Sequence, residues 1–225
     1  FEVFEGTALP DLNDEYRSIM EDYRDVAGRV ETKEALLWKT RVWKKLSFDA
    51  VKDYLMINNI TPKDDEEVKR AFEVHVAVLK KMGYYKNRLE GKHFADGSNN
   101  VPNELKEVLE RLKMIPPGEN HLFVRGTRWE VEGRGISLIY RRLHPLKPSP
   151  TIVAYGGGGT WGYHYKRSRG KLTNRERARL QTFPDWFLFS GSASEVRAQI
   201  GEAVPPLLGE KIAEAVKTIL SSKKG

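Results

Sequence analysis

The sequence of 225 residues predicts an α+β fold, on three observations. Apolar residues recur at helical spacing through about residue 95, they alternate with polar residues from His121 to Tyr165, and helical spacing returns near the C-terminus. A period of 3.6 indicates a helix with one buried face, whereas a period of two indicates a half-buried strand. We therefore expect a helical N-terminal part, a small β-rich region and C-terminal helices.

Three helices are expected in the N-terminal part. Asn13 or Asp14 can cap the first, which would run through about Ala27. Ser47 followed by Asp49 can cap the second, and Thr61-Pro62 opens a long third helix. Their apolar stripes are Tyr16, Ile19, Met20 and Tyr23, then Val51, Tyr54 and Leu55, then Val68, Phe72, His75, Val76, Leu79 and Met82. Trp38 and Trp43 are expected to anchor the core, with base stacking as the alternative.

A turn-rich stretch at residues 94–100 is the best candidate boundary. A short helix from Pro102 to Met114 follows, and Pro116 and Pro117 stop it because proline cannot continue the hydrogen-bond ladder. The alternating residues of the expected strands are Leu122, Val124, Trp129 and Val131, then Ile136, Leu138 and Tyr140. The expected regions are residues 1–98, 99–171 and 172–225.

Two helical signals mark the last region. Thr173 and Glu176 have the spacing of a capping box. The stretch from Glu210 to Leu220 has the pattern of a short amphipathic helix, with Ile212 and Val216 on its apolar face.

Composition excludes several classes of protein and site. The chain has no cysteine, which removes disulfides, thiolate zinc sites and cysteine nucleophiles together. No apolar run reaches the length of a membrane span and no signal peptide is visible, so we expect no membrane association and a cytoplasmic location. Because the chain opens on Phe1 rather than Met, we expect its true start to be missing or cleaved.

The net charge of +7 is unevenly distributed. Between Glu104 and Arg179 there are 16 Lys and Arg residues against 7 Asp and Glu, so the rest of the chain is slightly acidic. A basic excess confined to one stretch is typical of a phosphate-binding surface, and a solvated basic face is the alternative.

As an independent enzyme, the chain offers no catalytic residue and no metal ligand. No Gly-x-Gly-x-x-Gly follows a strand, and the four glycines at 156–159 indicate a hinge or a close approach of the backbone to DNA. The five histidines lack metal-ligand spacing, and no pair of carboxylates suggests an acid/base dyad.

Two stretches resemble a known family. Residues 172–185 read LTNRERARLQTFPD and residues 201–206 read GEAVPP. Together they resemble the last two conserved blocks of the DNA cytosine-5 methyltransferases, in the family's order and near its spacing. Upstream, Ile115 to Gly118, then Tyr140 to Leu143 and Pro148 to Thr151, resemble the target-recognition region of the bacterial enzymes. The resemblance covers about residues 111–220 and is most specific between residues 172 and 206.

The resemblance implies three groups of site residues. The DNA-binding candidates are Tyr140, Arg141, Arg142, Ser149, Thr151, Lys166, Arg167 and Arg169. An arginine can donate to guanine O6 and N7, but neighbouring arginines on a strand point to opposite faces, so at most one of Arg141 and Arg142 should reach a base. The alternative is that both form surface salt bridges. The penultimate block organises the recognition region through Thr173, Arg175, Glu176, Arg179 and Gln181.

The last block implies a part in binding the methyl donor, S-adenosylmethionine. The residues that would line its pocket are Gly201, Glu202, Ala203 and Val204. Most family members carry asparagine where this chain has Glu202, and a carboxylate accepts a hydrogen bond but donates none.

The resemblance implies the C-terminal portion of a DNA cytosine-5 methyltransferase of a restriction-modification system in a prokaryote. Its C-terminal helices would complete a Rossmann-like domain, and its β-rich region would read double-stranded DNA. A partner portion, from a split enzyme or a longer chain, would supply the nucleophilic cysteine of the Pro-Cys loop, the acid and most of the donor site. The chain alone would then be inactive. The alternatives are a non-catalytic DNA-binding module and a basic scaffold for a protein partner.

Overall fold

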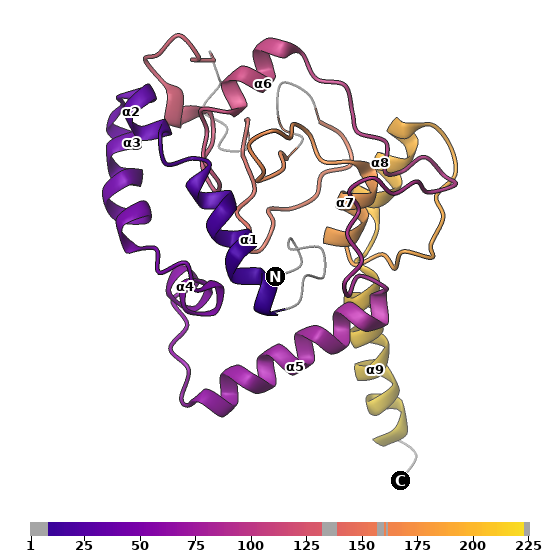
Figure 1. The fold of residues 1–225 in the computed structure, drawn as a ribbon. Coiled ribbons are helices and arrows are strands. Elements are labelled where there is room, and N and C mark those ends of the chain that lie inside the picture. Colours follow the sequence, from indigo (N-terminus) through magenta and orange to yellow (C-terminus); the bar gives the residue numbers. More distant parts are fainter. Residues whose placement is uncertain (1–8, 132–138, 157–159, 161, 223–225) are drawn as a thin grey trace.

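The computed structural model describes residues 9–131, 139–156, 160 and 162–222, and it is built from helices joined by long loops (Figure 1). In chain order the elements are α1 (Leu9–Glu21), α2 (Val26–Val30), α3 (Lys33–Leu37), the π-helix η2 (Trp38–Val42), the 3₁₀ helix η3 (Trp43–Lys45), α4 (Ala50–Ile57), α5 (Asp65–Met82), α6 (Lys106–Leu112), the 3₁₀ helix η4 (His121–Val124), α7 (Asn174–Leu180), α8 (Ala193–Glu202) and α9 (Pro206–Ser222).

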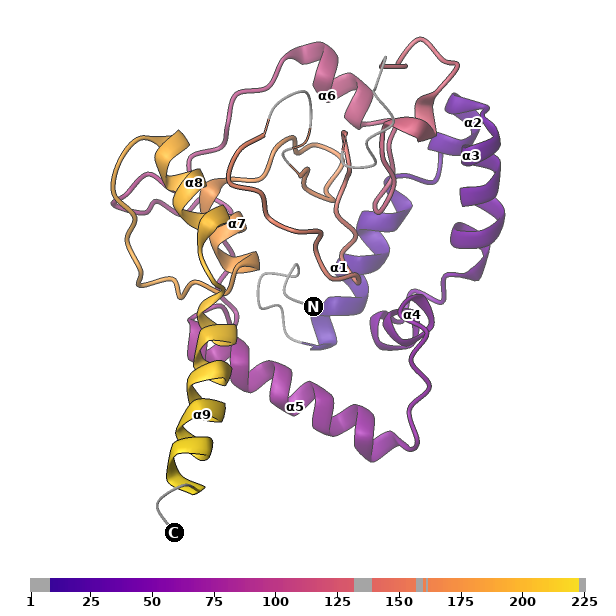
Figure 2. The ribbon, with the colours of Figure 1, turned by 180° about the vertical axis from the view of Figure 1, so that it is seen from behind.

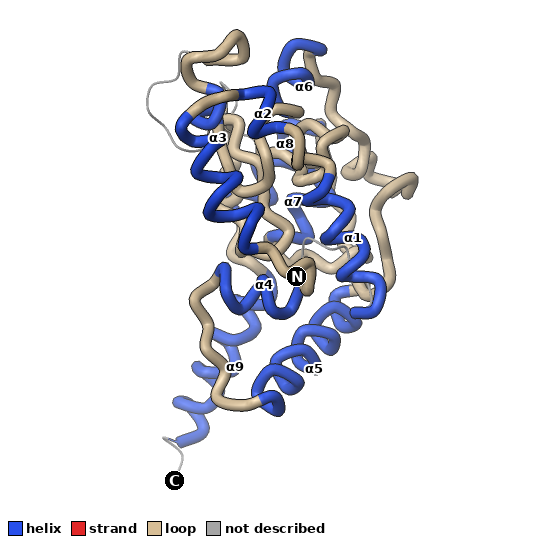
Figure 3. The backbone as a smooth tube through the Cα atoms, turned by 60° about the vertical axis from the view of Figure 1, so that its left-hand side comes forward, coloured by secondary structure: helices blue, strands red, loops and turns tan. Residues whose placement is uncertain are grey.

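The predicted α+β class is wrong, because the described residues contain no strand (Figure 3). The β-bridges in this part of the chain are two isolated ones, from Tyr163 to Arg142 and to Lys171, and a few further backbone hydrogen bonds join residues 118–121 to residues 139–142. Residues 121–124, expected to begin the first strand, form η4 with Asn120 as its cap. Ile136 and Leu138 of the second expected strand lie outside the described residues. Loops between helices therefore replace the predicted β-rich target-recognition domain.

Local backbone geometry explains why the alternating pattern does not form a sheet. Tyr140 has φ 48° and Gly162 has φ 71°, so the chain leaves the extended conformation beside each partner of the Arg142–Tyr163 bridge. The prolines at 145, 148 and 150 also lack the N–H donor that a ladder requires. The alternating apolar residues of this region therefore belong to irregular loops that pack between helices.

Arg142 supplies the hydrogen bonds that a ladder would otherwise provide. Its side chain is fully buried, and it donates from Nη2 to one carbonyl and from Nη1 to three others. The acceptors are Leu112 at 2.7 Å, Lys166 at 2.8 Å, Arg169 at 3.4 Å and His164. One guanidinium therefore joins the end of α6 to the loop at residues 164–169.

Two buried histidines also stabilise these loops, because their ring nitrogens accept hydrogen bonds from backbone amides. His144 Nδ1 accepts from the Leu146 amide at 3.0 Å, and His164 Nδ1 accepts from the Lys166 amide at 2.9 Å. Burial and nearby positive charge lower the pKa of His144 to about 3, so its ring is neutral at physiological pH. Burial, followed by the charges of Arg169, Lys166 and Arg142, also lowers the pKa of His164.

The N-terminal helices and the central loops share one hydrophobic core. This core runs from Leu12 to Tyr165 and includes the buried ring of Trp38. The Tyr23 hydroxyl donates to the carbonyl of Tyr165 at 2.9 Å, across 142 positions of sequence. Packing therefore continues across residue 98, and the three regions expected from the sequence remain a prediction.

The first helix differs from its prediction at both ends. It begins at Leu9 and ends at Glu21, so neither Asn13 nor Asp14 caps it, and α2 follows as a separate turn. The Asn13 side chain instead accepts from the amide of Ala50, the first residue of α4, at 2.7 Å. A residue read as a cap of its own helix therefore stabilises the start of another.

The remaining helices follow the sequence pattern more closely. Asp49 caps α4 as expected, whereas α5 begins at Asp65, with Asp64 as its cap, three residues beyond the predicted Thr61-Pro62 start. α9 extends the predicted C-terminal helix to Pro206 and Ser222. α5 starts on the side of α4 and runs toward α7 and α9, where it ends, and α9 projects away from the body (Figure 2).

The role of Arg142 predicts a large loss of stability in Arg142→Ala. Hydrogen bonds to a charged group are worth about 1.5–3 kcal/mol each, and their loss would leave buried carbonyls without a donor. We expect the free energy of unfolding to fall by about 3 kcal/mol or more in urea titrations. The exposed Arg125→Ala is the control and should change stability by less than about 0.5 kcal/mol. Equal effects of the two substitutions would contradict a structural role for Arg142.

Candidate functional site

The capping box predicted from residues 173–176 is confirmed at the start of α7. Glu176 Oε2 accepts from the Thr173 amide at 2.7 Å, and Thr173 Oγ1 accepts from the Glu176 amide at 3.0 Å. Glu176 Oε1 also accepts from Arg169 at 2.9 Å. The cap therefore fixes the helix start and a cationic side chain of the preceding loop.

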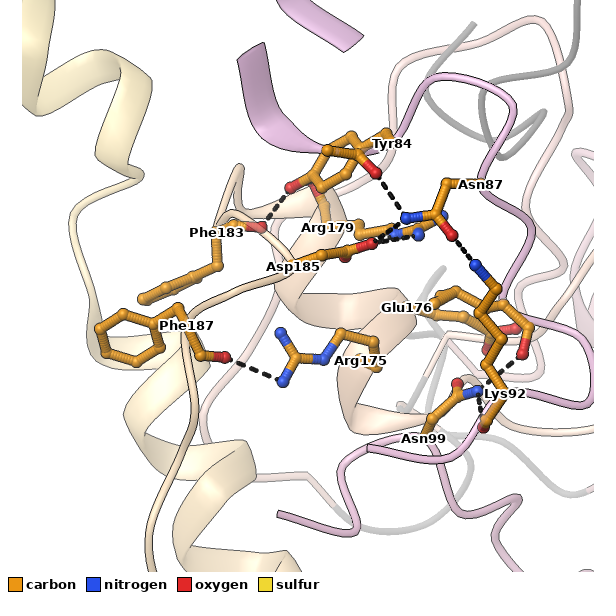
Figure 4. Close-up of polar contacts among 12 residues, drawn as sticks. Tyr84, Asn87, Lys92, Asn99, Arg175, Glu176, Arg179, Phe183, Asp185 and Phe187 are labelled. Carbon is orange, nitrogen blue, oxygen red and sulfur yellow. Dashed lines mark hydrogen bonds and ion pairs between the residues drawn. The ribbon is translucent and has the colours of Figure 1, made fainter. Parts of the chain in front are cut away.

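Arg175 is completely buried and joins α7 to the loop at residues 94–98. Its Nε donates to Ser98 Oγ at 2.9 Å, and its Nη2 donates to Asp96 Oδ2 at 2.7 Å. The same Nη2 donates to the Phe187 carbonyl at 2.9 Å, as Figure 4 shows. The guanidinium also lies 4.3 Å from the ring centre of Phe94. Two segments about 90 residues apart in the chain meet at this side chain.

Arg179 fixes the turn after α7 through a bidentate ion pair. Its Nε donates to Asp185 Oδ1 at 3.0 Å, and its Nη2 donates to Asp185 Oδ2 at 2.5 Å. Asp185 also accepts from Asn87 Nδ2 at 2.8 Å, and the Tyr84 hydroxyl donates to the Phe183 carbonyl (Figure 4). The penultimate block is thus attached to the chain segment that follows α5.

The last block packs tightly against the central loops. A Cβ on Gly201 would collide with the backbone of Val153 and Ala154, so only glycine fits where α8 meets this loop. Gln181 Nε2 donates to the Ile200 carbonyl at 3.0 Å and connects α7 to α8.

The outer side of the last block faces solvent. Ala203 has extended backbone at φ −71° and ψ 144°, and the Val204 side chain is 62% exposed. Glu202 accepts a hydrogen bond from Tyr155, which raises the pKa of that tyrosine. The segment thus presents an apolar side chain and a carboxylate acceptor on one open edge.

The eight DNA-binding candidates fall into different environments. Arg141 and Thr151 come together on one small pocket of about 20 Å³, which Arg177 and Thr160 also line. Arg142 is committed to backbone carbonyls and presents no surface to DNA in this structure. The remaining residues are Tyr140 beneath Arg111, Ser149 donating to Pro150, Lys166 paired with Glu90, Arg167 paired with Asp25 and Arg169 paired with Glu176.

Sequence reasoning missed the acidic partners of the buried arginines. Asp96 lies in a stretch identified only as a turn, and Asp185 in a stretch read as the end of a block. The useful signal is the alternation of Arg175, Arg177 and Arg179 within a helix, because buried arginines require carboxylates or carbonyls nearby.

Within the described part of the chain, no group of His, Asp and Glu side chains could hold a metal ion. No helix there has the length and apolarity to cross a membrane.

The contacts of Asp96 predict acid sensitivity. Burial raises its pKa, but hydrogen bonds from Ser98 and the Phe189 amide and the charge of Arg175 outweigh burial, so the pKa lies below its ordinary value. The stabilisation is present above the unfolded pKa of about 3.9 and is lost as pH falls through the folded pKa. Asp96→Asn should be less stable than the parent at pH 7, and urea titrations should show the difference shrinking below about pH 4. The exposed Asp14→Asn is the control. A constant difference from pH 7 to pH 3 would refute the linkage.

Comparisons with known proteins agree with these blocks. The C-5 cytosine-specific DNA methylase family matches residues 10–218. The chain is 56% identical to DNA (cytosine-5-)-methyltransferase M.ApeKI of Aeropyrum pernix, over 98% of this chain and 47% of that protein. It is 46% identical to type II methyltransferase M.NgoFVII of Neisseria gonorrhoeae, over 54% of this chain and 34% of that protein. It is 52% identical to type II methyltransferase M.BbvI of Brevibacillus brevis, over 49% of this chain and 30% of that protein.

The chain therefore spans about half the length of one of these relatives and about a third of the other two. No solved structure matches it. The family match extends over most of the chain, including residues 172–185 and 201–206 and the central loops before them. On this evidence, the chain belongs to the C-5 cytosine-specific DNA methylase family.

Proposed function

We propose that this chain is the C-terminal portion of a DNA cytosine-5 methyltransferase of a type II restriction-modification system. It would read duplex DNA and complete the donor site, while a partner portion supplies the cysteine nucleophile and the acid. The supporting observation is that both C-terminal blocks are folded and anchored, yet their outer apolar side is uncovered.

The uncovered side consists mainly of α9. None of the described residues of this helix is buried, and five large apolar side chains are each about half exposed: Leu208, Ile212, Val216, Ile219 and Leu220. Their spacing of three and four residues gives one continuous stripe. Trp186, 76% exposed, and Val204 extend the apolar surface beyond the helix. Exposed apolar surface of this extent is typical of a docking site.

The residues around the last block would contribute in simple ways to methyl transfer. Bound S-adenosylmethionine would supply the methyl group. The Glu202 carboxylate would accept a hydrogen bond from the donor, and Val204 would exclude water from its apolar side. The close contact of Gly201 with residues 153–154 would hold this edge against the recognition loops.

DNA recognition would centre on the pocket shared by Arg141 and Thr151. Arg141 is half-buried, so its orientation is restricted before DNA arrives, and a bidentate contact to guanine would then lose less side-chain entropy. Arg142, Arg175 and Arg179 would act through the fold and would not touch DNA. Lys166, Arg167 and Arg169 would contact phosphates only by exchanging the carboxylates that they now bind.

Reconstitution tests the proposal. The chain is mixed with the N-terminal half of M.ApeKI, and transfer of a radioactive methyl group from S-adenosylmethionine to duplex DNA is measured. We expect transfer with the mixture and none with either part alone. Complete absence of transfer from a mixture of two folded parts would reject the proposal.

The α9 stripe provides a matched pair of variants. Ile212→Glu with Val216→Glu should abolish both association and transfer, because charged side chains would be buried in the interface. Lys217→Glu changes the net charge by the same amount on an exposed position of the same helix and should retain both. Circular dichroism of each variant would establish that its helices are intact.

A further inference from the structure

A second basic surface lies on the N-terminal helices, in a part of the chain that is slightly acidic overall. It is carried by α3, η2 and η3, which form one column at the edge of the molecule beside α2 (Figures 1 and 2). Residues 33–45 contain five basic residues and one acidic residue, Glu34. The five, named here the α3–η3 basic face, are Lys33, Lys39, Arg41, Lys44 and Lys45.

The inner side of the column is fixed by aromatic packing. Ala35 and Trp38 are buried, and Trp43 stacks on Trp38 with ring centres 6.2 Å apart. Phe123 meets Trp38 edge-on at 6.4 Å. The hydroxyl of Thr32, the cap of α3, donates to the Phe123 carbonyl at 2.9 Å. The column is therefore rigidly attached to the central loops, and its outer side has a fixed orientation.

The outer side keeps its cations exposed and without counter-ions. All five residues of the α3–η3 basic face are exposed, and none forms an ion pair with any residue that the structure describes. Lys166, Arg167 and Arg169 of the central loops differ, since each has a carboxylate partner. A group of five exposed cations without ion-pair partners among the described residues therefore lies outside the stretch that the overall charge count singles out.

The column also contains an unusual turn. Trp38–Val42 forms a π-helix, and the Thr40 hydroxyl donates to the carbonyls of Leu36 and Leu37 at 2.9 and 3.3 Å. Single π turns are rare and frequently occur at functional sites. Here the turn carries Lys39 and Arg41 of the basic face, and η3 with Lys44 and Lys45 follows it directly.

We propose that the α3–η3 basic face binds the phosphate backbone of duplex DNA outside the recognised sequence. The inference extends the proposed function, because it gives the N-terminal helices a role in holding the DNA that the recognition loops read. Phosphate contacts fix the register of a protein on the duplex without carrying sequence information. The column of 13 residues is about 20 Å long at a rise of 1.5 Å per residue, enough to meet several phosphates.

The composition of the face favours DNA over a protein partner. Protein–protein interfaces are depleted of lysine and centre on apolar and aromatic groups. This face is mostly lysine, and among its large apolar side chains only Leu36, 61% exposed, points to solvent in the described residues. Salt-dependent binding to a polyanion is the chemistry that such a surface supports.

Two variants with equal loss of charge test the inference on the full 225-residue chain. The first replaces Lys39, Arg41, Lys44 and Lys45 with Ala. The control replaces Lys63, Lys69, Arg70 and Lys217, which are exposed elsewhere, with Ala. Binding to a 30-base-pair duplex of random sequence is measured by fluorescence anisotropy over a range of NaCl concentrations, after circular dichroism has shown that both variants are folded.

The basic-face variant should lose about tenfold or more in affinity near 0.1 M salt. The slope of log K against log salt should become shallower by about 0.9 for each phosphate contact removed. The control should bind like the parent. An unchanged affinity and slope in the first variant, or equal losses in both variants, would overturn the inference. The inference would also be overturned if the basic-face variant bound DNA normally but no longer associated with the catalytic portion. That result would identify the face as a protein-docking surface.

The outcomes separate this inference from the proposed function. Methyl transfer by the reconstituted mixture, together with unchanged DNA binding by the basic-face variant, would reject the inference alone. Loss of DNA binding by that variant without any methyl transfer in reconstitution would reject the proposed function alone. Arg141→Ala should show the opposite pattern to the basic-face variant, with a changed sequence preference in a randomised duplex pool and a nearly unchanged salt slope.

Discussion

The fold depends on buried arginines that donate to backbone carbonyls and to a few carboxylates. A region without a sheet still has to satisfy the polar groups of its main chain, since each buried group left unpaired costs free energy. Arg142 meets this requirement for the central loops, and Arg175 meets it for the Phe187 carbonyl in the turn after α7. Arg175 also donates to the side chains of Asp96 and Ser98. The planar guanidinium suits the task because it carries five donors in a fixed arrangement. Irregular loops can therefore be as firmly positioned as strands.

The same principle gives the penultimate block its structural meaning. Arg175, Arg177 and Arg179 alternate within one short helix, yet all three are buried. Arg175 reaches Asp96, Arg179 reaches Asp185, and Arg177 donates to the Val153 carbonyl at 3.3 Å. Each arginine thus attaches α7 to a different segment. This block is rich in positive charge, and its three arginines lie at an internal junction of loops.

The sequence predicted those features that depend on local patterns. The capping box at Thr173, the cap at Asp49 and the buried ring of Trp38 were predictable because neighbouring residues specify them. The strands were predicted wrongly because alternation reports which side chains are buried and not whether another strand is in reach. Asn13 was assigned to the wrong helix, and its contact with Ala50 depends on packing between α1 and α4.

The candidate site could be predicted only in part for the same reason. The motifs identified the positions, but distant segments decide whether an arginine lines the surface or lies in the interior. Arg141 lines a pocket with Thr151, whereas its neighbour Arg142 is enclosed by α6 and the loop after Tyr163. The α3–η3 basic face escaped detection because the charge was summed over long stretches, and the region outside residues 104–179 is slightly acidic as a whole.

The contact at Gly201 has a mechanical consequence. Its backbone lies directly on residues 153–154, so α8 and the loop that follows Thr151 have no space in which to slide past one another. Gln181 ties α7 to the same helix. The Gly201 contact and the Gln181 hydrogen bond therefore join α7, α8 and the loop at residues 153–154 into one packed unit. Any side chain larger than hydrogen at position 201 would push this helix and this loop apart.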